Sequence, residues 1–224
     1  FRIDLKDTIT NGVNTATVLG DLAQFGALVT RGPVDPGFPT LPGPIIGIAQ
    51  TNLNLGQVKV AGLDVDFKFS LPLAGGKLGA SLAGTYFTKY DVQNLDGSFS
   101  GGLDATNIAT GGIVPRWKHY AAIDYSRGPW GFTLSQNWQK AYNDLAPTGG
   151  TPLRRVPAYE LYDIQARYSG FKSVELLAGI RNLFDKDPPY SNAGGQTAFQ
   201  GSYDPTYADP RGRFYYAGMT YKFY

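Results

Sequence analysis

The stretch that decides the fold is PRWKHYAAIDYSRGPWGFTLSQNW, at residues 115–138. Apolar and polar residues alternate on both sides of the central SRGPW, at residues 126–130. A side-chain period of two is the pattern of a β-strand with one apolar face, and neighbouring Gly and Pro mark a turn. The stretch therefore predicts two antiparallel strands joined by a short turn.

The same alternation recurs along the rest of the chain. It predicts six further strands, near residues 1–9, 63–71, 77–90, 162–168, 174–181 and 215–223. Several of them reach the roughly 9–11 residues with which a tilted strand crosses a bilayer. Apolar residues are then expected to face outward and polar residues inward.

The connections between these strands alternate in length. Short turns are predicted at residues 71–77, 126–130 and 169–173, and long loops at 11–55, 93–115, 144–156 and 185–212. This order is typical of an up-and-down membrane barrel with short periplasmic turns and long extracellular loops. Within the first loop, the apolar spacing of Val18, Leu19, Leu22, Phe25 and Leu28 predicts a short helix, and residues 45–49 a short strand.

Aromatic residues cluster near both ends of the predicted strands, as in the girdles of a membrane barrel. Those near the short turns are Tyr125, Trp130, Tyr168 and Phe223, and those toward the long loops are Tyr90, Trp117, Trp138, Tyr142 and Tyr159. The single histidine, His119, is expected beside Trp117 on the outward face.

Composition narrows the function classes. The 224 residues carry a net charge of only +2, which gives no electrostatic case for nucleic acid as a partner. There is no cysteine and one histidine, so neither a thiolate nor a histidine-rich metal site is expected. No GxSxG motif occurs, and the lone histidine leaves no hydrolase triad. We expect no cofactor and no enzymatic activity.

Pattern and composition alone leave three architectures open. The chain forms part of a larger membrane barrel, a self-contained eight-stranded barrel that acts as a structural protein or small pore, or a soluble β-sandwich that binds a ligand. The small residues expected inside, such as Gly79, Ser81 and Thr133, favour a wide lumen or a close neighbour over a filled eight-stranded barrel.

The C-terminal sequence favours the first of these three architectures, part of a larger membrane barrel. AGIRNLFDKDPPYSN at residues 178–192 and YDPTYADPRGRFYYAGMTYKFY at 203–224 resemble the end of TonB-dependent outer-membrane receptors. LGQVKVAGLDVDF, the stretch at 115–138 and YELYDIQARYSG, at 159–170, resemble them too. The resemblance implies an all-β, antiparallel transmembrane barrel of 22 strands, to which residues 1–224 contribute about the last eight.

The resemblance also implies a function. Such a receptor imports a scarce, bulky nutrient across the outer membrane of a Gram-negative bacterium, with an iron–siderophore complex favoured as the small-molecule substrate. Its partners are the lipid bilayer and lipopolysaccharide, the rest of the barrel with its plug domain, and the TonB complex. Plug, TonB box and the earlier strands are not expected in this chain, whose start, FRIDLKDTI, lies within a predicted strand without a signal segment.

Two groups of functional residues follow. Polar residues on the inward face toward the long loops are expected to face substrate or plug: Lys89, Asp91, Arg116, Lys118, Asn143 and Arg181. Members of the family usually end on an aromatic residue that faces lipid and that the barrel-assembly machinery recognises. The resemblance implies that Tyr221, Phe223 and Tyr224 form this assembly signal. Phe223 is in phase with Tyr221 and carries the signal, or Tyr224 takes that part through a distortion at the end of the strand.

The last long loop has two further features. Asp185, Asp187 and the prolines at 188 and 189 are interpreted as the exit from a strand, because proline lacks the N–H that continues a ladder. Asp204, Asp209, Arg211 and Arg213 predict ion pairs that order the loop. Their spacing is not that of an EF-hand calcium site.

Overall fold

The computed structural model describes residues 1–10, 13–50, 52–95, 97–104, 106–107, 112–144, 154–192 and 201–223. The chain divides into two compact units. The first contains Phe1–Ile3, Lys59–Val92 and Ser100–Tyr224, and the second contains Asp4–Val58 and Gln93–Phe99. The first unit holds most of the main sheet described below and the connections after residue 100.

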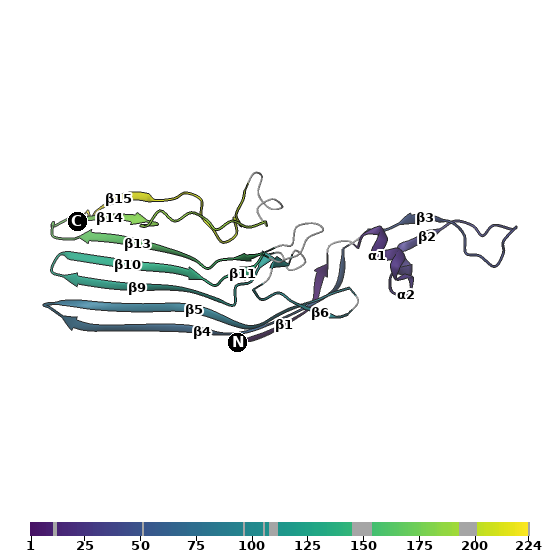
Figure 1. The fold of residues 1–224 in the computed structure, drawn as a ribbon, viewed down its shortest axis with the longest axis horizontal. Coiled ribbons are helices and arrows are strands. Elements are labelled where there is room, and N and C mark those ends of the chain that lie inside the picture. Colours follow the sequence, from purple (N-terminus) through teal and green to yellow (C-terminus); the bar gives the residue numbers. More distant parts are fainter. Residues whose placement is uncertain are drawn as a thin grey trace. The chain divides into compact units, whose positions relative to one another are not determined.

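One antiparallel sheet dominates the structure, with its strands hydrogen-bonded in the order β1-β4-β5-β9-β10-β13-β14-β15 (Figure 1). These strands are β1 (Arg2–Thr10), β4 (Leu53–Leu73), β5 (Gly76–Gln93), β9 (Trp117–Arg127), β10 (Trp130–Gln139), β13 (Tyr159–Tyr168), β14 (Val174–Arg181) and β15 (Phe214–Tyr221). Each predicted strand is present. Predicted strands that follow one another in the sequence are also neighbours in the sheet. The β-sandwich alternative is wrong, because these strands form a single sheet.

The strand order also bears on the stand-alone barrel. The order begins at β1 and ends at β15, and these two strands are not paired with each other in the described part of the chain. Eight strands that formed a complete barrel would close on themselves. The sheet is therefore an open stretch of wall, which contradicts the self-contained eight-stranded barrel.

The register gives the sheet two chemically different faces. Leu134 lies directly opposite Ile123 on β9 and Ile164 on β13, so apolar side chains line up across strands. We call this side the apolar face; its large exposed members include Leu63, Phe67, Phe69, Ile123, Phe132, Leu134, Ile164, Tyr215 and Met219. Exposed fractions of 55% for Phe67 and 68% for Met219 show that no described part of the chain covers it.

The opposite side, which we call the polar face, carries hydrogen-bonded side chains. Thr133 Oγ1 donates to Asp124 Oδ1 at 2.6 Å, and Thr85 Oγ1 donates to Asp64 Oδ1 at 2.7 Å. Because β-strand side chains alternate between faces, the alternating sequence produces both faces at once. The predicted inward and outward sets are thus separated as expected.

Tight turns join the strands at one end of the sheet (Figure 1). Between β4 and β5, Ala74 and Gly75 both have positive φ, 49° and 73°, as a two-residue type I′ turn requires. Between β9 and β10, Gly128 has a φ of 55° and is followed by a proline. The long connections leave from the other end, which we call the long-connection end.

Short elements occupy these connections. They are β6 (Phe99–Gly101), which pairs with β5, the pair β7 (Thr106–Asn107) and β8 (Gly112–Ile113), and the pair β11 (Tyr142–Asn143) and β12 (Arg155–Val156). β4 has 21 residues and β5 has 18, well beyond the roughly 9–11 that cross a bilayer. These two strands therefore continue past any membrane-crossing segment.

The second unit has a small core of its own. It contains α1 (Thr15–Gly20), α2 (Leu22–Phe25), the 3₁₀ turn η1 (Gly26–Leu28), and the paired strands β2 (Val29–Arg31) and β3 (Ile45–Ile48). Asn14 Oδ1 caps α1 by accepting from the backbone N of Thr17 at 2.9 Å. Val18 and Phe25 are buried as the spacing predicted, whereas Leu19 and Leu22 are exposed.

None of the described helices is long and apolar enough to span a membrane.

Candidate substrate-facing site

Two adjoining cavities lie on the polar face at the long-connection end. The larger, about 340 Å³, is lined by Asn137, Leu161, Asp163, Arg181, Asn182, Asp209, Arg211, Gly212 and Phe214. The smaller, about 200 Å³, is lined by Lys118, Asn137, Trp138, Gln139, Tyr159, Leu161, Tyr207 and Asp209. The shared residues Asn137, Leu161 and Asp209 make them one hollow between the strands and the connection that precedes β15.

Two cations in this hollow stand beside tyrosine rings. Lys118 Nζ lies 5.9 Å from the centroid of the Tyr207 ring, and Arg181 Cζ lies 5.7 Å from that of Tyr216. A cation within about 6 Å of a ring is attracted by the negative face of that ring. Tyr207 lines the hollow and Tyr216 does not, so the hollow presents positive charge together with aromatic surface mainly beside Lys118, a combination suited to an anionic ligand with flat rings.

The acids in the hollow already have partners. Asp163 Oδ1 accepts from the backbone N of Asn182 at 2.8 Å. Asp209 accepts from Arg211 Nε at 2.9 Å, and this hydrogen bond is the main cause that lowers the pKa of Asp209 below its usual value. Asp209 therefore stays ionised at neutral pH and holds Arg211 at the rim.

Asp104 connects the roots of two long connections. Its Oδ1 accepts from the backbone N of Arg116 at 2.8 Å, and its Oδ2 accepts from Arg116 Nε at 3.2 Å and Lys140 Nζ at 2.6 Å. Burial raises the pKa of Asp104, but these hydrogen bonds outweigh burial, and the net effect lowers that pKa. Sequence analysis missed Asp104; its left-handed φ of 54° marks a turn that the sequence signals only weakly, through the preceding GG.

The motif RNLFDKD makes the exit from β14. Asn182, with φ at 51° and 5% exposure, donates from Nδ2 to the backbone O of Lys186 at 2.9 Å and accepts at Oδ1 from its N at 2.8 Å. Asp185 is also left-handed and accepts from the backbone N of Arg213 at 2.7 Å. β14 ends at Arg181, so the exit begins earlier than predicted: Asn182 and Asp185 form it, ahead of the prolines that were expected to end the ladder.

A small core holds the connections after β10 and β14 together. Tyr142 and Val156 are buried and pack with Tyr207. Asp144, only 2% exposed, accepts from Ser191 Oγ at 2.8 Å and from the backbone N of Asn192. Burial is the main cause that raises the pKa of Tyr142 to about 12. This loop core positions Tyr207 over Lys118.

The six residues predicted to face substrate separate into three settings. Lys118 and Arg181 line the hollow. Lys89 and Asp91 form an ion pair on β5 at 3.2 Å. Arg116 is bound by Asp104, and Asn143 donates from its backbone N to the Asp104 backbone O at 2.7 Å. Contact of any of them with substrate or plug stays a prediction.

The predicted girdles are partly corrected by burial. Trp130 lies 4.6 Å from Tyr168 between ring centroids near the short turns, as expected of a girdle. Tyr142 instead belongs to the loop core, and Tyr159 lies opposite Gln139 on the polar face. Both were wrongly assigned, because an aromatic residue near a strand end can face either side.

His119 lies on the apolar face beside Trp117, as predicted. Trp117 Nε1 donates to His119 Nδ1 at 2.8 Å, and His119 Nε2 lies 3.2 Å from Gln136 Oε1. Gln136 Nε2 in turn donates to the hydroxyl of Tyr162 at 2.6 Å. This series of hydrogen bonds satisfies polar side chains that would be costly to leave unpaired in hydrocarbon. Such a series fits the edge of an apolar band.

The structure gives the settings of the C-terminal aromatic residues and of the acids and arginines in the last long connection. Tyr221 and Phe223 are in edge-to-face contact at 4.7 Å, and Phe223 is 90% exposed, whereas Tyr224 lies outside the described residues. Of the loop ion pairs, Asp209 binds Arg211, while Asp204 accepts from the backbone N of Thr206. Within the described ranges no group of three or more His, Cys, Asp or Glu could hold a metal ion.

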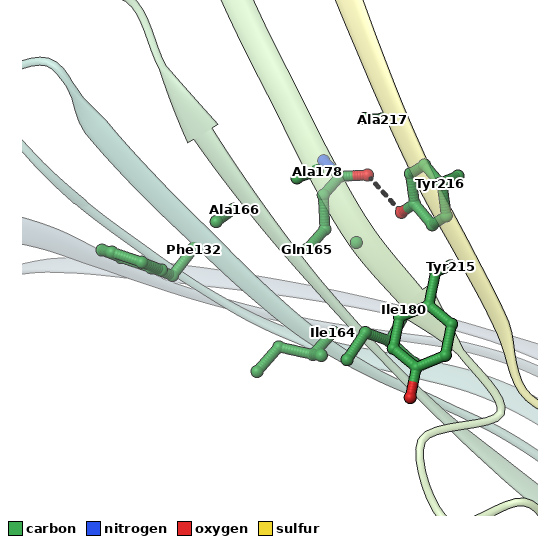
Figure 2. A pocket seen from close by; sticks show the side chains of 10 residues that line it. Phe132, Ile164, Gln165, Ala166, Ala178, Ile180, Tyr215, Tyr216 and Ala217 are labelled. Atoms are coloured by element: carbon green, nitrogen blue, oxygen red, sulfur yellow. Dashed lines mark hydrogen bonds between the residues drawn. The ribbon is translucent and has the colours of Figure 1, made fainter.

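A cavity of about 580 Å³ lies on the apolar face, away from the charged hollow. Figure 2 shows its lining, with Phe132 and the alanines at 166, 178 and 217. The one hydrogen bond drawn there runs from the Tyr216 hydroxyl to Gln165 Oε1 at 3.0 Å. Both residues are at positions that belong to the polar face. An apolar opening of this kind does not suit a charged substrate.

Comparison with known proteins identifies the family. The model of the family described as TonB dependent receptor-like, beta-barrel, matches residues 1–183. The chain belongs to this family. A curated relative, the probable TonB-dependent siderophore receptor PiuA of Acinetobacter baumannii, is 28% identical over 144 residues, which are 61% of this chain and 18% of PiuA.

Solved structures agree with this receptor barrel fold. A mutant of the ferric enterobactin receptor PfeA of Pseudomonas aeruginosa matches with a TM-score of 0.58 at 22% identity, over 98% of this chain and 28% of that one. The siderophore receptor PirA of Acinetobacter baumannii matches with a TM-score of 0.58 at 17% identity, over 99% and 28%. The chain spans less than a third of the length of these receptors.

Proposed function

We propose that this barrel segment is part of an outer-membrane transporter that imports an iron–siderophore complex with energy from the TonB complex. Family membership supports transport, and the siderophore receptors among the relatives support the substrate class. The observation that carries the proposal for this chain is the hollow in which Lys118 and Arg181 stand beside tyrosine rings. Ferric siderophores whose iron is held by ionised, ring-bearing oxygen ligands match that chemistry.

The two faces of the sheet suit the proposed location. The apolar face would contact lipid, and the polar face would line the lumen and meet a plug domain. The long-connection end, where the hollow and the loop core lie, would face the outside of the cell. In this arrangement the segment supplies wall and binding loops and performs no covalent chemistry.

The test is ligand binding by the native receptor purified from outer membranes. A ferric catecholate siderophore is titrated calorimetrically, with cobalamin and an oligosaccharide as competing ligand classes. We expect saturable binding of the ferric siderophore alone, and iron-limited growth on it that depends on an intact TonB system. Preferential binding of cobalamin or of the oligosaccharide would overturn the substrate class, and growth independent of TonB would overturn the energy coupling.

A further inference from the structure

One acid belongs to both cavities of the charged hollow. The charged residues that line the two cavities in the described part of the chain are Lys118, Asp163, Arg181, Asp209 and Arg211. Among them, Asp209 alone lines both cavities. Three cations and two acids leave this lining with a net charge of +1. An anionic ligand in either cavity therefore meets the repulsion of Asp209.

The carboxylate of Asp209 is held by a close neighbour in the sequence. Its Oδ1 accepts from the backbone N of Arg211 at 3.0 Å and from Arg211 Nε at 2.9 Å. Its Oδ2 accepts from Arg211 Nε at 2.9 Å and from Arg211 Nη2. The charge of Arg181, which lines the same cavity, also acts on it through space. Asp209 thus occupies one cation of the larger cavity and offsets another.

Two other acids of this region have a structural setting that Asp209 lacks. Asp163 accepts from the backbone N of Asn182, 19 residues further along the chain. Asp104 joins two connections through its hydrogen bonds to Arg116 and Lys140. Every hydrogen bond that described residues donate to the carboxylate of Asp209 comes instead from Arg211, two positions later. The charge of Asp209 therefore does not tie distant segments together.

The pair of Asp209 and Arg211 is open to exchange. The exposed fraction of the side chain is 41% for Asp209 and 66% for Arg211. Exposed ion pairs contribute little to stability and are screened by salt. A guanidinium binds anionic oxygen groups through parallel hydrogen bonds, whether the oxygens come from the protein or from a ligand. A ligand anion in the larger cavity can thus replace the carboxylate of Asp209 on Arg211.

We propose that Asp209 is an internal competitor of the ligand. In the empty hollow, its carboxylate occupies Arg211 and offsets the charge of Arg181. On binding, an anionic oxygen group of the ligand takes its place on Arg211, and Asp209 turns toward solvent. Asp209 thereby weakens binding and speeds release, which suits a transporter that must pass its ligand on. The inference rests on the proposed function, which makes the hollow the ligand site.

The first experiment is a double-mutant cycle on the native receptor purified from outer membranes. Asp209→Asn removes the charge, and its amide oxygen can still accept from the backbone N of Arg211. Arg211→Gln removes the guanidinium for which Asp209 competes. Asp66→Asn is the matched control, because Asp66 pairs with Lys68 two residues later at 3.5 Å, is exposed and lies outside both cavities. Calorimetry gives the affinity of each protein for a ferric catecholate siderophore.

We expect Asp209→Asn to bind the ferric siderophore roughly fivefold more tightly than the wild type. Most of this gain should disappear in the Arg211→Gln background, because the group for which Asp209 competes is then absent. Asp66→Asn should bind like the wild type. No gain from Asp209→Asn would overturn the proposal. An equal gain in both backgrounds would overturn it too, because Asp209 would then act only through its charge at a distance.

The second experiment needs no siderophore. Phenylglyoxal reacts with guanidinium groups, and peptide mass spectrometry gives the rate of this reaction at Arg211. The rate should be severalfold higher in Asp209→Asn than in the wild type, and unchanged in Asp66→Asn. Citrate, a compact polycarboxylate, should slow the reaction more in Asp209→Asn than in the wild type. Equal rates and equal protection by citrate in these two proteins would overturn the proposal.

The two readouts separate this inference from the proposed function. If no ferric siderophore binds but the reaction at Arg211 responds to Asp209→Asn and to citrate as expected, only the proposed substrate is contradicted. If the siderophore binds to the wild type and Asp209→Asn changes neither affinity nor reaction rate, only the competition is contradicted. Should Asp209→Asn not fold, Asp209→Ser keeps a side-chain oxygen for the turn and gives the same test.

Discussion

The Oδ2 atom of Asp104 lies 2.6 Å from Nζ of Lys140, 36 residues further along the chain. The same carboxylate accepts from Arg116, so one acid holds the connection before β9 to the connection after β10. Charge-assisted hydrogen bonds of this kind are stronger than neutral ones, and Asp104 is 19% exposed, so solvent screens them only partly. Asp104 therefore organises the approach to the charged hollow without lining it.

Asp104→Asn should loosen both connections while leaving the sheet intact. The amide keeps the shape of the side chain but loses the charge that Arg116 and Lys140 neutralise, at a cost of about 1–3 kcal/mol. Limited proteolysis should cut residues 97–116 faster than in the wild type. Asp91→Asn, which breaks the exposed pair with Lys89, is the matched control and should leave the cleavage rate unchanged. Equal rates in all three proteins would contradict the role of Asp104.

The same contact should weaken in acid. The pKa of Asp104 is lowered in the folded protein, so its contribution to stability is present above the ordinary aspartate pKa, about 3.9. That contribution is lost as the pH falls through the folded value. Protease sensitivity of the connection should therefore rise below about pH 4, and Asp104→Asn should remove this part of the pH dependence.

Asn182 should be more important to stability than its place in a loop suggests. Asn182→Gly keeps the left-handed backbone but loses both hydrogen bonds to Lys186, which should cost about 1–3 kcal/mol. Asn182→Ala loses the same bonds and adds about 1–2 kcal/mol of left-handed strain. Urea unfolding should thus rank the wild type above the glycine variant and the alanine variant last. An alanine variant as stable as the glycine variant would show that strain at φ 51° is unimportant.

The loop core should melt in alkali before the sheet does. Tyr142, 3% exposed, has its pKa raised to about 12. A group whose pKa is raised on folding stabilises the folded state fully at pH values below its pKa in the unfolded chain, which is about 10 for tyrosine. This stabilisation, about 2–3 kcal/mol for Tyr142, is lost as the pH rises toward 12. Burial also raises the pKa of Tyr159 and Tyr207, so ultraviolet absorbance of phenolate should show several late-titrating tyrosines, of which Tyr142 gives the last step. Tyr142→Phe should remove this last step. Its persistence in that variant would assign the late titration to another tyrosine.

What the sequence predicted, and what it missed, have physical causes. The position of Leu134 opposite Ile123 and Ile164 follows from a period of two, which any strand repeats along its length, so strands and faces could be predicted. Asp104 meets Lys140 only because two irregular connections fold together, and no local pattern encodes that contact. Among the predicted site residues, Lys118 and Arg181 are on the polar face as expected, because alternation along a regular strand decides the face.

Lys118 and Arg181 should be important to ligand affinity rather than to folding. Lys118→Gln and Arg181→Gln each remove one positive charge from the hollow, and each should weaken binding of an anionic ferric siderophore by roughly tenfold. Lys68→Gln removes a charge of the same sign near the short turns, outside both cavities and outside the predicted substrate-facing set, and is the control. Calorimetric titration gives the affinities, and circular dichroism checks the fold. Siderophore affinities equal to that of Lys68→Gln would place the ligand elsewhere.

The C-terminal aromatic residues should govern insertion into the membrane. Phe223 is 90% exposed and contacts Tyr221, so it extends the outward row of β15, whereas Tyr224 comes one residue later in the alternation. Phe223→Ala should reduce the folded fraction in outer membranes several-fold, while deletion of Tyr224 should preserve it. Heat-modifiable migration on gels separates folded from unfolded protein. The opposite ranking of the two variants would transfer the assembly signal to Tyr224 and imply a distortion at the end of β15.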